Sequence, residues 1–244
     1  IAAWNGSGWQ ALGQGLLGNS GQICYALTTW DPDGDGPSGP VLVAGGQFDF
    51  AGGLASSNNV NKIAYWDGTS WNAFGPPNTA TTGMSDWVRA LTTWDPDGGG
   101  PLAPQVVAAG DFITAGGVTV NRIARWDGSA WQPFGSGFDN GQVYSLAVHN
   151  GELIAGGGFT ISGGVTMNRI ARWDGSAWQP FGTGMDFNSN VQALATWDPD
   201  GSGSASPQIV AGGLFNNNNP PMLPGNCVAR WDGAAWQPFG QGVD

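Results

Sequence analysis

The chain has 244 residues and a formal net charge of -11, with 7 basic and 18 acidic residues. This charge repels phosphate backbones and anionic lipid surfaces, which argues against nucleic acid as a partner. No apolar run approaches the roughly 20 residues of a membrane-spanning helix, so we expect no membrane insertion. Only 10% of residues are charged, so the surface must consist largely of polar, uncharged residues. Such a surface indicates an extracellular or cell-surface protein.

One nine-residue phrase recurs along the whole chain. It reads IAAWNGSGW at 1–9, IAYWDGTSW at 63–71, IARWDGSAW at both 123–131 and 170–178, and VARWDGAAW at 228–236. The first tryptophans of successive copies are 47 to 62 residues apart. Such a period is typical of propellers and repeat arrays, in which each repeat is one small unit that packs against its neighbours. We therefore expect a single domain over residues 1–244.

The shortest repeat shows the internal plan of each unit. Its expected strands are 143–148, 152–156, 169–173 and 177–181. The turns between them contain Asn150-Gly151 and Asp174-Gly175, dipeptides that tolerate a positive φ in tight hairpins. The pattern predicts four antiparallel strands per repeat.

The other repeats keep this plan and lengthen the hairpin between the first and second strands. An all-β β-propeller of four-stranded antiparallel blades is therefore the predicted fold. Whole blades are expected at about 22–74, 87–135, 143–182 and 191–240, and residues 1–12 are expected to form the outer half of another blade. Five-bladed closure would need two more strands. We expect the chain to be a fragment of a longer protein, or a partner chain to supply the missing pair.

The second strands end in a double glycine, as in VLVAGG at 41–46 and LIAGG at 153–157, and a Trp-Asp pair and a further Trp follow. These features resemble kelch-type propeller repeats, with Trp-Asp where kelch repeats usually have Tyr-Asp. The phrase NRIARWDG is also similar to repeat propellers of large bacterial surface proteins. The resemblance covers nearly the whole chain and implies a propeller architecture. It implies no single activity, because kelch propellers include oxidases, adaptors and adhesins.

One loop carries the first half of a calcium-binding pattern. Asp31, Asp33 and Asp35 alternate and Gly36 follows, which matches the beginning of a D-x-[DN]-x-[DN]-G loop. Gly39 and Leu42 stand where the later acidic ligands would be. Calcium at Asp31, Asp33 and Asp35 is a hypothesis, and a hairpin tip stiffened by Gly and Pro is the alternative. No other cofactor is expected.

Residues suited to catalysis are scarce. His149 is the lone histidine and lies in an expected turn, and Cys24 and Cys227 are expected to be unpaired thiols. The recurrent Asp of the Trp-Asp-Gly phrase is accounted for by its turn, and the recurrent Arg residues by packing along aromatic rings. Neither a copper centre like that of kelch-type oxidases nor a Ser-His-Asp arrangement can be assembled. We therefore expect no enzymatic activity.

Two functions remain. The first is a non-catalytic extracellular interaction or structural module, which binds protein and could associate with itself through the incomplete N-terminal blade. The second is a multivalent, lectin-like propeller that binds glycans through repeated aromatic platforms. Exposed Trp faces in near-equivalent pockets would favour the lectin, and buried Trp side chains would favour the scaffold. A kelch-like enzyme is a third and disfavoured alternative.

Overall fold

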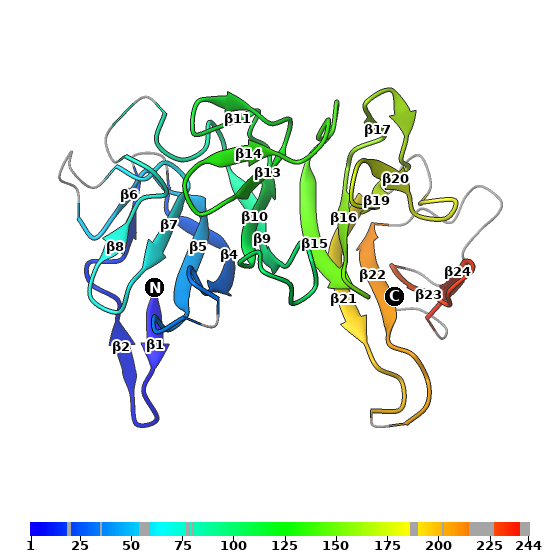
Figure 1. Cartoon of the computed structure of the whole chain (residues 1–244), viewed down its shortest axis with the longest axis horizontal. Helices are drawn as coiled ribbons and strands as arrows, with labels where there is room; N and C mark the ends of the chain where they lie inside the picture. Colours follow the sequence, from blue (N-terminus) through cyan, green and yellow to red (C-terminus); the bar gives the residue numbers. More distant parts are fainter. Residues whose placement is uncertain are drawn as a thin grey trace. The chain divides into compact units, whose positions relative to one another are not determined.

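The computed structural model describes residues 1–18, 21–34, 36–53, 59–76, 79, 81–185, 190–201, 203–214 and 227–239. Within these ranges every regular element is a β-strand. The chain divides into two compact units, an N-terminal unit at Ile1–Phe134 and a C-terminal unit at Gly135–Asp244. Each unit contains two four-stranded antiparallel sheets (Figure 1).

The four sheets are numbered here in chain order. Sheet 1 is β4 (Ile23–Trp30), β5 (Val41–Gln47), β7 (Ile63–Trp66) and β8 (Trp71–Asn72). Sheet 2 is β9 (Val88–Trp94), β10 (Gln105–Gly110), β13 (Ile123–Trp126) and β14 (Trp131–Pro133). Sheet 3 is β15 (Val143–His149), β16 (Glu152–Gly157), β19 (Ile170–Trp173) and β20 (Trp178–Pro180). Sheet 4 is β21 (Asn190–Trp197), β22 (Gln208–Leu214), β23 (Val228–Trp231) and β24 (Trp236–Pro238).

Four two-stranded sheets accompany them. The N-terminal hairpin consists of β1 (Ala2–Trp4) and β2 (Trp9–Ala11). The other three pairs are β3 (Leu16–Leu17) with β6 (Phe50–Ala51), β11 (Thr114–Ala115) with β12 (Val118–Thr119), and β17 (Ile161–Ser162) with β18 (Val165–Thr166). The sequence analysis did not predict these three short pairs, because two-residue strands leave no alternating pattern to detect.

The predicted four-stranded antiparallel units are confirmed. In sheet 3 the strands lie where the sequence placed them, to within one or two residues at each end. Asn150 and Gly151 both have positive φ, 51° and 80°, as the first turn requires. In the second hairpin only Gly175 has positive φ, so a left-handed backbone conformation does not explain Asp174.

The second glycine of the double-Gly motif is the residue that fits a close backbone contact within each sheet. The first strand of every sheet contains a register shift opposite this glycine, a β-bulge that brings backbone close to it. A Cβ would lie 2.0–2.1 Å from a backbone carbonyl oxygen. The residues concerned are Gly46, Gly110, Gly157 and Gly213.

Within each unit, one sheet packs on the next through the same contacts. In the C-terminal unit, Trp236 Nε1 donates a hydrogen bond of 3.0 Å to the carbonyl oxygen of Phe181 in the preceding repeat. In the N-terminal unit, Trp71 Nε1 donates a bond of 2.9 Å to the carbonyl oxygen of Leu12. The N-terminal hairpin is therefore docked on sheet 1 as the outer two strands of a repeat are docked on the following sheet. Large buried side chains such as Phe112, Trp131 and Ile154 fill the interior of the units.

Candidate functional site

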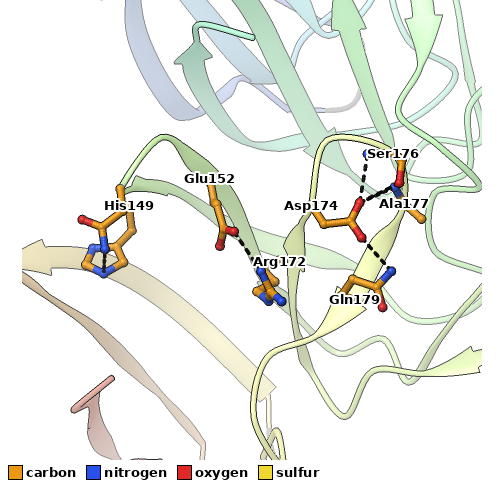
Figure 2. A network of polar contacts seen from close by, with 8 residues as sticks. His149, Glu152, Arg172, Asp174, Ser176, Ala177 and Gln179 are labelled. Atoms are coloured by element: carbon orange, nitrogen blue, oxygen red, sulfur yellow. Dashed lines mark hydrogen bonds and ion pairs between the residues drawn. The ribbon is translucent and has the colours of Figure 1, made fainter. Parts of the chain in front are cut away.

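The recurrent Trp-Asp-Gly turn uses its aspartate as a hydrogen-bond acceptor for the backbone. Asp174 Oδ1 accepts bonds from the backbone N–H groups of Ser176 and Ala177, at 2.9 and 2.8 Å. Its other oxygen accepts a bond of 2.9 Å from Gln179 Nε2 (Figure 2). The same arrangement recurs at Asp67 and Asp127.

These bonds favour the charged carboxylate. The backbone N–H groups of Ala177 and Ser176 hold the pKa of Asp174 well below its usual range. Asn5 forms the same turn in the N-terminal hairpin, accepting backbone bonds of 3.0 and 2.9 Å. The turn therefore needs an acceptor oxygen and not a titratable group, as the sequence analysis predicted.

Most tryptophans of the recurrent phrase are buried. Those in sheets 2 and 3 are no more than 9% exposed, and each pair packs edge to face at 5.5 Å between ring centroids. Trp66 and Trp231 are half-buried, and Trp4 and Trp9 of the N-terminal hairpin are exposed by 57% and 71%. The rings of sheets 2 and 3 are therefore held in packing contacts, and they offer little surface to a ligand.

The proposed calcium loop is described only in part, because Asp35 lies outside the described residues. Asp31 Oδ1 accepts a bond of 3.3 Å from the backbone N–H of Asp33, and Asp33 Oδ2 accepts one of 3.1 Å from Ser38. Both carboxylates thus support the hairpin tip. Among the residues that the structure describes, no group of three or more His, Cys, Asp or Glu is placed to hold a metal ion. Calcium at this loop remains a hypothesis.

An apolar, open strand edge lies at the N-terminal hairpin. Among the described residues β1 pairs only with β2, whereas each equivalent strand, such as β7, pairs on both sides. Beside it the face of β4 is uncovered, with Ile23 and Leu27 exposed by 45% and 52%. Cys24 is exposed too, although Val88 and Val191 at the same position of sheets 2 and 4 are fully buried. A hollow of about 510 Å³ is lined by Ile1, Leu16, Gln22, Cys24, Tyr25, Ala26 and Leu27.

A second hollow, the C-terminal cavity, lies between sheets 3 and 4. It has a volume of about 610 Å³ and is lined by residues of both sheets and of their hairpins. Arg172 Nη1 and Glu152 Oε1 form an ion pair at 2.8 Å, with side chains 37% and 41% exposed (Figure 2). His149 Nε2 lies 3.1 Å from Asn150 Nδ2. Phe181 and Trp231 contribute aromatic rings whose centroids are 4.7 Å apart.

The electrostatics of this cavity follow from partial burial. Burial lowers the pKa of His149, although the negative charge of Glu152 acts in the opposite direction. Burial therefore favours the neutral form of the His149 imidazole. Its Nδ1 atom is buried and has no hydrogen-bond partner within the described structure.

This cluster was not predicted, because His149 lies beside Asn150-Gly151 and its place in the sequence indicates only a turn. The strand registers place His149 where the other three sheets have Trp30, Trp94 and Trp197. Comparing the last residue of each first strand across the repeats would have exposed the departure. The recurrent Arg side chains form hydrogen bonds within their own repeats: Arg125 and Arg230 bond Gln105 and Gln208, and Arg169 bonds the carbonyl oxygens of Gly158 and Phe159. Their packing along aromatic rings stays a prediction.

No family model and no curated protein sequence matches the chain. None of the described elements is a helix of the length and apolarity needed to cross a bilayer.

Proposed function

We propose that this chain is a non-catalytic, extracellular β-propeller module of kelch-like repeats that binds another protein. The four similar sheets, the sheet-on-sheet contacts repeated within each unit and the docked N-terminal hairpin support the arrangement of blades in a five-bladed ring. The Trp-Asp-Gly phrase supports a structural role, because its polar groups hold the turn and its rings in sheets 2 and 3 are buried.

The observation that carries the proposed activity is the edge of β1 that no described strand covers. Edge strands are normally protected by charges, prolines or covering segments, because unpaired backbone groups recruit other strands. Residues 1–18 include no charged side chain and no proline. The exposed rings of Trp4 and Trp9 and the uncovered face of β4 add apolar surface beside this edge. Such an edge is suited to binding by strand addition.

The partner that we propose is a second copy of the chain. Two β1 strands related by a two-fold axis would pair antiparallel and give a sheet in the order β2-β1-β1-β2. The result would be a four-stranded antiparallel sheet, which matches the four described sheets in strand number and direction. A two-fold contact also buries the same apolar surface twice.

The backbone bonds of the hairpin identify the groups available for pairing. The N–H of Leu12 donates to the carbonyl oxygen of Ile1 at 3.3 Å, and the N–H of Asn5 donates to that of Gly8 at 3.1 Å. Because bonded and non-bonded pairs alternate in antiparallel ladders, Ala3 bonds to Gln10 and the backbone groups of Ala2 face the open edge.

Sedimentation velocity over a range of protein concentrations tests the proposal. We expect a concentration-dependent dimer, and we expect Ala2→Pro to abolish it, because proline removes the outward N–H without breaking a bond to β2. Ala11→Pro is the matched control, since Pro133 and Pro180 occupy the same position in β14 and β20. A monomer at every concentration, or a dimer that survives Ala2→Pro, would contradict the proposal.

A further inference from the structure

We propose that the C-terminal cavity is a binding site for a neutral saccharide, separate from the β1 edge. The site is a single one, built by residues that depart from the repeat, and it does not depend on repeated Trp platforms. Its volume of about 610 Å³ lies within the roughly 300–1,000 Å³ of small-molecule sites.

In the N-terminal unit, aromatic side chains occupy much of the position that corresponds to the C-terminal cavity. Between sheets 1 and 2 the equivalent hollow is about 360 Å³, and Trp30, Tyr65 and Phe74 pack against one another there. Their ring centroids are 5.2–6.4 Å apart. The register assigns His149 to the position of Trp30 and Arg172 to that of Tyr65. The smaller histidine leaves space, and both replacements bring polar atoms to it.

Glu152 is a second departure from the repeat. Sheets 2 and 4 have Gln105 and Gln208 at this position, each bonded to its own Arg at 3.1 and 2.9 Å. Only in sheet 3 among the described sheets does a carboxylate take this place, pairing with Arg172 at 2.8 Å. The pair is more than a third exposed, so both partners can also bond to a ligand.

The chemistry of the lining selects the ligand class. Glu152 and Asp232 are acidic and Arg172 is basic, so the lining is slightly negative and disfavours a free anion. Adjacent hydroxyl groups can donate to a carboxylate and accept from a guanidinium at the same time. The half-buried ring of Trp231, backed by the buried Phe181, offers an apolar surface for the carbon face of a sugar ring. A saccharide satisfies both demands together.

The single histidine makes the test direct. The full chain is first screened on an array of neutral and acidic glycans, and bound neutral glycans are then titrated while the His149 ring signals are followed by NMR. We expect at least one neutral glycan to shift these signals with saturation. His149→Trp, which installs the residue of the other three sheets, should weaken binding at least tenfold by filling the cavity. Glu152→Gln, the residue of sheets 2 and 4, should weaken it by a similar factor.

Gln105→Glu is the control, because it alters the equivalent position of sheet 2 and should leave the affinity unchanged. Far-ultraviolet circular dichroism establishes that each variant is folded, and Glu152→Gln is nearly isosteric, so it remains informative if His149→Trp does not fold. The proposal is overturned if no glycan of the array binds, if only acidic glycans or inorganic phosphate shift the His149 signals, or if affinity survives Glu152→Gln. None of these results depends on whether the chain dimerises.

Discussion

Gly156 in β16 lies against the side chain of Val191 in β21, so closely that a Cβ on Gly156 would be 2.4 Å from Val191 Cγ1. The same relationship joins Gly45 in β5 to Val88 in β9, with 2.5 Å between the corresponding atoms. The first glycine of the double-Gly motif is therefore the place where the next sheet packs. Gly212 holds this position in sheet 4, and there the nearest atom is 3.7 Å from the Cβ position.

We predict that replacement by alanine destabilises the protein at Gly156 and not at Gly212. Gly156→Ala should lower the free energy of unfolding by about 1–3 kcal/mol, because the added methyl group overpacks the contact between sheets 3 and 4. Gly212→Ala should leave it nearly unchanged, since a methyl group there meets only ordinary contacts. Urea denaturation followed by tryptophan fluorescence measures both. Equal losses would show that backbone conformation, and not sheet packing, selects glycine.

The double-Gly motif was visible in the sequence, but the physical reason for it was not. The alternation within strands and the Asn-Gly and Asp-Gly turns depend on neighbouring residues, so they were enough to predict four-stranded units. The reason for each glycine depends on residues distant in the chain: Gly157 faces the carbonyl oxygen of Gln142, and Gly156 faces Val191. Such packing is invisible until the strands are paired.

The C-terminal cavity was hidden for a similar reason. His149, Glu152 and Arg172 are separated by turns and strands, and their proximity follows from the registers of β15, β16 and β19. A comparison of the repeats could have indicated the cavity, because a residue that differs from its counterparts does not have their packing role. That β1 pairs with β2 alone among the described strands, in contrast, was anticipated from the strand count.

We predict that Trp71 holds the N-terminal hairpin in place. Trp71→Phe removes the 2.9 Å bond to the carbonyl oxygen of Leu12 and some of the aromatic surface near Gly13. A bond of this kind contributes about 1 kcal/mol, so amide hydrogen exchange in β1 and β2 should become at least about fivefold faster. Exchange in sheets 3 and 4 should not change.

Trp236→Phe is the matched variant for this prediction. It removes the equivalent 3.0 Å bond to Phe181 in the C-terminal unit. It should leave exchange in the N-terminal hairpin at the wild-type rate. Faster exchange in that hairpin in both variants would indicate a global loss of stability and contradict a local role for Trp71.

We predict that Asp127 stabilises the folded protein by accepting hydrogen bonds from its turn, and that this stabilisation is lost at low pH. Burial raises the pKa of Asp127, but hydrogen bonds from the backbone N–H groups of Ala130 and Ser129 outweigh this and lower the pKa to about 2. A lowered pKa in the folded state means that the contribution is complete above the unfolded value of 3.8 and is lost as pH falls towards 2.

Two substitutions separate the acceptor from the charge. Asp127→Asn should keep most of the stability at pH 7, as Asn5 does in the N-terminal hairpin, and should reduce the loss between pH 4 and pH 2. Asp127→Ala should lower the unfolding free energy at pH 7 by about 1 kcal/mol, a modest amount because the turn is exposed. Urea midpoints at pH 7, 4 and 2 decide between them. If Asn and Ala behaved alike at pH 7, the turn bonds would contribute nothing.

We predict that His149 titrates below its ordinary pKa of 6.5, because burial disfavours the imidazolium. Glu152 opposes this effect, so Glu152→Gln should lower the pKa of His149 further. A lowered pKa in the folded state means that the unfolded chain takes up the proton first, so stability should decrease as pH falls from about 6.5 through the folded-state pKa. His149→Gln should remove this part of the pH dependence.

NMR titration of the imidazole signals, free of overlap because the chain has one histidine, measures the pKa in wild type and in Glu152→Gln. An increase in the pKa on Glu152→Gln would contradict the electrostatic coupling between the two side chains across the cavity.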